Sequence, residues 1–196
     1  MLGDGNGAYK THQYRDLFAE LGHPPSESRA KIDKAFQQLF HGDGQEERIY
    51  FETGANDNGP LAYITDWANN DARSEGMSYG MMIAVQLNKK LEFDAIWNWA
   101  NTYMLITDPK NPSVGYFAWS MSTDGTPRST RHSAGMVAAA AVGSLAASPG
   151  EASKAFLQEL WDMPVPAGEQ RYFDGMLYIM SMMHLSGEFR VIERKR

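Results

Sequence analysis

Apolar side chains recur at helical spacing in three stretches of the chain, residues 26–41, 91–106 and 150–162. In each stretch the apolar positions share one helical face and the polar positions share the other, which predicts amphipathic helices that cover a core. The first stretch begins at Ser26, which can cap a helix, and ends before Gly42. The faces consist of Ile32, Ala35, Phe36, Leu39 and Phe40; Phe93, Ile96, Trp97, Ala100 and Met104; and Phe156, Leu157, Leu160 and Trp161.

Three other stretches, residues 75–88, 132–148 and 171–187, are apolar or small nearly all round and predict helices buried on most sides. Outer and inner helices therefore alternate along the chain, as in antiparallel helix hairpins arranged around a common centre. The fold class that we predict is all-α, of the (α/α)6-toroid type. Six or seven helices make about half of such a ring, so its open apolar flanks would favour a homo-oligomer.

Between these helices, the pattern predicts a few shorter elements. Residues 48–54 alternate as a short extended piece does, and residues 56–60 have the composition of a turn. A short helix is expected at residues 61–68, with Trp67 on it. Alternation followed by Asp124-Gly125 predicts an extended hairpin arm at residues 114–127. At helical spacing, Trp97, Met81 and Met82 are expected to be core residues.

Length, charge and composition reduce the number of possible functions and partners. The 196 residues fit a single domain, 1–196, and the net charge of -6 argues against nucleic acid as a partner. There is no cysteine, no signal-like apolar region and no run of apolar residues long enough for a membrane span. We therefore expect a cytoplasmic protein that does not interact with a membrane. The five histidines are scattered singly, so neither a metal nor another cofactor is expected.

Carboxylates and aromatic residues remain as candidates for chemistry. Flat aromatic faces stack on sugar rings, and paired carboxylates carry out the proton transfers of glycoside cleavage, so a carbohydrate site explains both together. The candidates are Asp66, Asp71, Glu75, Asp124 and Asp174, with Trp67, Tyr79, Trp119, Tyr172 and Tyr178.

Glu75 has two interpretations on local grounds. It lies in the first turn of a predicted helix, where the helix dipole alone favours a negative charge. Together with Arg73, that dipole lowers the pKa of Glu75, whereas a general acid needs a raised one. An acid role therefore requires burial and a neighbouring carboxylate, for which Asp71 and Asp124 are the possible sources.

Two stretches, "DARSEGMSYGMMIAVQLNKKLEFDAIWNWA" and "GYFAWSMSTDGTP", resemble family 8 glycoside hydrolases, and more closely their branch of reducing-end xylose-releasing exo-oligoxylanases. Residues 1–130 look like the N-terminal part of the family barrel, and residues 131–196 look like its C-terminal part. The resemblance implies an (α/α)6 barrel that inverts at the anomeric carbon and releases xylose from the reducing end of β-1,4-linked xylo-oligosaccharides.

The resemblance also assigns roles to particular residues. Glu75 stands in the place of the general acid, and Arg73 precedes it as in the family. Trp119 falls where an aromatic residue lines the sugar cleft, and the remaining positions lie in segments that contribute to that cleft. The substrate-binding residues implied are Arg73, Trp119, Asp124, His132 and Tyr172.

One departure from the family is large. A long central block, which in the family carries the base aspartate, is missing, since "DGTPRST" runs directly into "RHSAGM". An active hydrolase would then need a substitute base or a cleft completed by a dimer. Alternatively, the chain is a catalytically inactive remnant that binds sugar or serves only in assembly. The possible substitute bases are Asp66, Asp71, Asp124 and Asp174.

Overall fold

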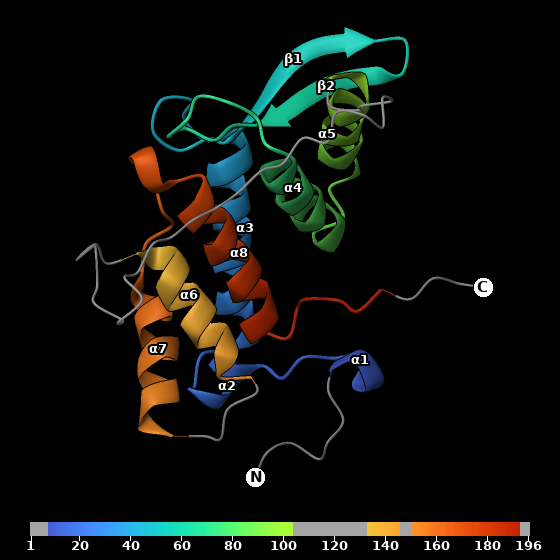
Figure 1. The fold of residues 1–196 in the computed structure, drawn as a ribbon. Coiled ribbons are helices and arrows are strands. Elements are labelled where there is room, and N and C mark those ends of the chain that lie inside the picture. The colour runs from blue at the N-terminus through green and yellow to red at the C-terminus, as the bar shows by residue number, and fades with distance from the viewer. Residues whose placement is uncertain (1–7, 104–132, 146–149, 193–196) are drawn as a thin grey trace, which may run out of the picture.

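The computed structural model describes residues 8–103, 133–145 and 150–192, which form a bundle of helices with one two-stranded hairpin at its end (Figure 1). The predicted hairpin at 114–127 lies outside these residues. The described elements are α1 (Ala8–Thr11), α2 (Leu17–Glu20), α3 (Pro25–His41), β1 (Tyr50–Asn56), β2 (Gly59–Ile64), α4 (Ser74–Gln86), α5 (Lys90–Tyr103), α6 (Ala134–Gly143), α7 (Glu151–Asp162), the 3-10 turn η1 (Gly168–Gln170) and α8 (Phe173–Leu185).

The six long helices predicted from hydrophobic spacing are confirmed, with ends that differ by a few residues. In α3 the predicted face is the buried one, and Pro25 occupies the first turn, where its missing N–H costs nothing. The helix ends at Gly42, whose N–H donates to the carbonyl of Gln38. Periodicity predicted these helices because each has to bury its apolar side.

Helix α8 lies at the centre and contacts α3, α4 and α6, with α7 packed outside α6 (Figure 1). It is buried on most sides, as expected. Helices α6 and α8 approach closely because Gly135 has no side chain, and a Cβ there would lie 2.7 Å from an oxygen of Asp174. The hydroxyl of Ser133, which caps α6, donates to that carboxylate at 2.9 Å.

The short helix predicted at residues 61–68 is wrong, because residues 59–64 form β2. This strand pairs antiparallel with β1, from Tyr50 opposite Ile64 to Asn56 opposite Gly59. Its apolar side is buried, and Asn98 of α5 donates to the carbonyls of Gly59 and Pro60 at 3.0 Å. Cross-strand pairing and packing on α5 therefore override the local preference of the segment.

Helices α4 and α5 leave an apolar face open, which corrects the expectation for Trp97 and Met82. These side chains are 55% and 45% exposed rather than in the core, and Met81 is only partly buried. They line an open groove of about 630 Å³ together with Phe93 of α5 and the segment after α8. An open apolar flank is what a partial ring would leave. Self-association through it stays a prediction.

Within the described parts of the chain, no group of three or more histidine, aspartate or glutamate side chains is arranged to hold a metal ion. No helix among the described residues is long and apolar enough to span a bilayer.

Candidate active site

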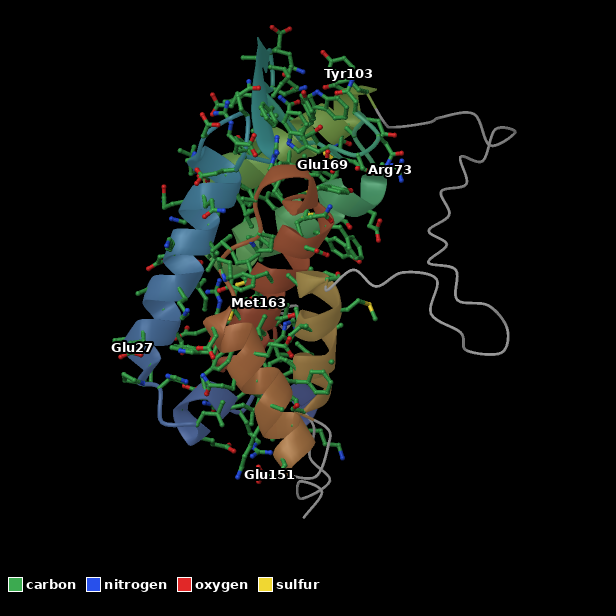
Figure 2. The ribbon with its side chains drawn as sticks, turned by 90° about the vertical axis from the view of Figure 1, so that its left-hand side faces the viewer. Glu27, Arg73, Tyr103, Glu151, Met163 and Glu169 are labelled. Atoms are coloured by element: carbon green, nitrogen blue, oxygen red, sulfur yellow. The ribbon has the colours of Figure 1, made fainter. Side chains whose placement is uncertain are left out.

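Glu75 lies in the first turn of α4, at the end of the bundle that carries the hairpin. Arg73 precedes the helix in an extended conformation, with φ -115° and ψ 145°. Figure 2 shows Arg73 and Glu169 of η1 at this end, whereas Glu27 and Glu151 lie at the other. The segments that lead into α4 and α8 therefore lie at the same end of the bundle.

Arg73 is held by two carboxylates of the loop before α4. Its Nε donates to Asp71 at 3.0 Å and lies 3.2 Å from an oxygen of Asp66. Backbone hydrogen bonds in both directions, of 2.8 and 3.4 Å, tie Asp66 to Asp71 and close the loop. Asp66 is only 3% exposed and also accepts from the N–H of Ala68 and the side chain of Asn69. Arg73 therefore stays beside Glu75 at a fixed place.

The carboxyl group of Glu75 is partly buried, and its two oxygens differ. Oε1 accepts a hydrogen bond of 3.4 Å from the hydroxyl of Tyr79, one turn along α4, whereas Oε2 is buried with no partner among the described residues. Burial raises the pKa of Glu75, and the charge of Asp66 raises it further, against the opposing effects of Tyr79 and Arg73. The pKa of Glu75 is thus shifted in the direction that a general acid needs, and Asp66 is the carboxylate that contributes to this shift.

Tyr172 packs against the start of α4 rather than facing solvent. It is 4% exposed, and a Cβ on Gly76 would lie 2.4 Å from its hydroxyl oxygen. That hydroxyl is buried without a hydrogen-bond partner in the described structure. Burial, followed by the charges of Asp66 and Glu75, raises the pKa of Tyr172 well above its usual value, so the phenol stays neutral. A direct contact of Tyr172 with sugar stays a prediction.

The structure brings Arg73, Glu75 and Tyr172 together at one place. The other predicted site residues, Trp119, Asp124 and His132, lie outside the residues that the structure describes. Sequence reasoning named Asp66 as a candidate base but missed its effect on Glu75. It also missed Arg171, whose only sequence signal is that it directly precedes Tyr172.

Each candidate for a substitute base that the structure describes already has a hydrogen-bond or ion-pair partner. The Asp66 carboxylate accepts two hydrogen bonds and forms an ion pair with Arg73, and Asp174 is buried and bonded to Ser133. Asp71 is more exposed, with 47% of its side-chain area accessible, but it pairs with Arg73. Among the carboxylates that the structure describes, Asp71 is thus the one of this set with solvent access close to Glu75.

Comparisons with known proteins agree with the motif. Residues 56–128 match the family described as glycosyl hydrolases family 8. A reducing end xylose-releasing exo-oligoxylanase of Halalkalibacterium halodurans is 46% identical over 123 residues, which are 63% of this chain and 30% of that protein. The exo-oligoxylanase Rex8A of Paenibacillus barcinonensis is 47% identical over 122 residues, again 30% of its length. The matched segment thus spans about a third of these curated relatives.

Solved structures extend the likeness over most of the chain. The GH8 xylobiose complex from Teredinibacter turnerae aligns with a TM-score of 0.80 and 23% identity, covering 94% of this chain and 99% of that one. Rex8A complexed with xylose aligns with a TM-score of 0.78 and 20% identity, covering 96% and 100%. At such identities the likeness concerns the fold, and it confirms the helical toroid type. The chain is therefore similar to the family 8 glycosyl hydrolases, in sequence over residues 56–128 and in fold over most of its length.

Proposed function

We propose that this chain carries the acid half of a glycosidase site for β-1,4-linked xylo-oligosaccharides, with Glu75 as proton donor. The observation that carries the proposal is the burial of Glu75 beside Asp66, which raises its pKa although Arg73 lies next to it. The substrate class comes from the relatives, which are named reducing-end xylose-releasing exo-oligoxylanases.

In the proposed reaction, Glu75 gives its proton to the glycosidic oxygen as the bond to the anomeric carbon breaks. A water attacks that carbon from the opposite face and loses a proton to a base, which gives inversion and free xylose. An inverting pair of carboxyl groups stands about 6.5–9.5 Å apart to leave room for this water. Since Asp66 and Asp174 are buried and bonded, neither is suited to accept that proton.

The comparisons support a missing internal block as the reason that a suitable base is not found in Asp66 or Asp174. Because 122 residues make up only 30% of Rex8A, that protein is much longer than the 196 residues of this chain. A structural alignment that extends over the whole Rex8A chain must therefore leave a block of it without a counterpart here. In this proposal the missing block held the base, and the chain keeps the acid.

Formate is expected to increase the release of xylose from xylotriose by about tenfold or more, because a small carboxylate from solution can replace a missing base. The measurement is chromatographic detection of xylose with and without sodium formate, with sodium chloride at equal ionic strength as the control. Glu75→Gln should show no such increase, since its acid is gone. An equal response of both proteins would contradict the assignment of Glu75.

An inactive sugar-binding remnant is the second candidate, favoured by the pairing of every described substitute carboxylate. In this case xylobiose binds without turnover, and formate changes nothing. Xylobiose should then alter tryptophan fluorescence, as expected when sugar rings stack on an indole. A flat titration together with no turnover would reject both functions and leave an assembly role.

A further inference from the structure

Two segments that are distant in sequence bring the neighbours of Glu75 into place. Asp66 comes from the loop after β2, and Tyr172 comes from the turn before α8. The charge of Asp66 raises the pKa of Glu75, and the ring of Tyr172 packs against Gly76, the residue next to Glu75. A contact that joins the two segments would therefore fix the surroundings of Glu75.

The residues next in sequence, Trp67 and Arg171, make such a contact. The guanidinium carbon of Arg171 lies 3.6 Å from the centre of the Trp67 ring, which is a close cation–π arrangement. Both side chains also donate to one acceptor, the carbonyl of Arg48, from Nε of Arg171 at 3.2 Å and from Nε1 of Trp67 at 3.3 Å. The stack is thus oriented by hydrogen bonds at its edge.

A third segment is attached to the same contact. Nη1 of Arg171 donates to the carbonyl of Gly168 at 2.7 Å, and the N–H of Gly168 donates to the carbonyl of Glu46 at 2.6 Å. Arg171 therefore joins the loop after α3, the loop after β2 and the turn before α8.

Arg171 is 2% exposed, and the hydrogen bonds recorded for it go to carbonyl oxygens. Burying a guanidinium is costly, and here burial lowers the pKa of Arg171 against the favourable charges of Glu46 and Asp43. Its Nη2 is buried without a partner among the described residues. A less costly apolar side chain could fill the space but could not join three segments at one point.

We propose that Arg171 and Trp67 are positioning residues, which hold Asp66 and Tyr172 against Glu75 and so maintain the environment of the proton donor. Neither residue is assigned a contact with substrate. The inference rests on the proposed role of Glu75, but the arrangement itself can be measured without turnover.

Loss of the contact between Arg171 and Trp67 would change the pKa of Glu75 in one direction. Water would reach the carboxyl group, and the negative charge of Asp66 would move away. The positive charge of Arg73 would then act on Glu75 with less opposition from Asp66. Each of these changes favours the carboxylate and lowers the pKa of Glu75. Of the other charged or titratable groups near it, Tyr79 also favours the carboxylate, and Asp71 stays paired with Arg73.

The test follows the ¹³C signal of the Glu75 carboxyl group across pH, with the signal assigned by its loss in Glu75→Gln. Arg171→Met and Trp67→Ala are each expected to lower the pKa of Glu75 by at least about half a pH unit, a small part of what burial can impose. Trp67→Phe keeps an aromatic face under the guanidinium, so it should retain most of the shift.

Arg190→Met is the matched control. Arg190 donates to the carbonyls of Val85 and Gln86 at the opposite end of α4, so its loss should lower thermal stability without moving the pKa of Glu75. If Arg171→Met fails to fold, the comparison of Trp67→Ala with Trp67→Phe decides. An unchanged pKa of Glu75 in the folded Arg171 or Trp67→Ala variant would overturn the proposal, whether or not the protein hydrolyses xylotriose.

Discussion

Glu75→Gln is expected to lower xylose release from xylotriose by about 10²–10⁴-fold, the range that a positioned general acid contributes. Glutamine has nearly the same shape, and its amide can still accept the hydrogen bond from Tyr79. It has no acidic proton for the leaving oxygen, so the loss should appear in turnover rather than in folding. The measurement is chromatographic detection of xylose, with formate present to supply the base function.

The same variant has an expected signature in stability. Because the pKa of Glu75 is raised on folding, its contribution favours the folded state below the pKa of the unfolded chain. That contribution is lost as the pH rises through the higher pKa of the folded protein. The stability of Glu75→Gln minus that of wild type should therefore be greater at pH 7 than at pH 4. Thermal unfolding of both proteins at both pH values measures this difference.

Glu151→Gln is the matched control, since Glu151 also lies in the first turn of a helix but is exposed at the other end of the bundle. It should change neither turnover nor the pH dependence of stability. Equal rates of xylose release in wild type and Glu75→Gln would rule out Glu75 as the proton donor. A stability difference independent of pH would instead mean that its pKa is not raised.

Gly76→Ala is expected to destabilise the protein by about 1–2 kcal/mol, although alanine in a helix interior normally stabilises by about 0.5–1 kcal/mol. The new Cβ would lie 2.4, 2.7 and 2.9 Å from three ring and hydroxyl atoms of Tyr172. A buried aromatic ring cannot bend away, so Tyr172 or α4 has to move. For a chain of this length, the loss should appear as a decrease in Tm of several degrees.

Gly143→Ala provides the opposite expectation in α6, because a Cβ there meets nothing within 4 Å. It should be neutral or stabilise by up to about 1 kcal/mol. Tyr172→Leu removes the ring with which the new Cβ of Gly76→Ala would clash. The double variant should therefore lose less stability than the sum of the losses in the two single variants. A stabilising Gly76→Ala would contradict the close packing of Tyr172 against α4.

Helix existence was predictable because each long helix has to bury an apolar face, and that requirement fixes a spacing along the chain. The spacing did not predict what covers each face. Trp97 and Met82 have the same periodicity as core residues, yet they line an open groove because no described segment packs over them. The strand β2 was missed because its partner β1 and its support on α5 are tertiary contacts.

The sequence by itself determined the alternation of helices and the motif around Glu75 and Arg73, and its resemblance to the family led us to expect that a central block is missing. It left the direction of the pKa shift of Glu75 open, since the helix dipole and Arg73 lower that pKa whereas burial, which the sequence does not show, raises it. Only the tertiary structure decided that balance. Asp66 and Tyr172, more than 100 residues apart in sequence, both lie near the start of α4, where the burial of Glu75 and the charge of Asp66 raise the pKa of Glu75. The sequence could not show this, because desolvation and charge act through space rather than along the chain.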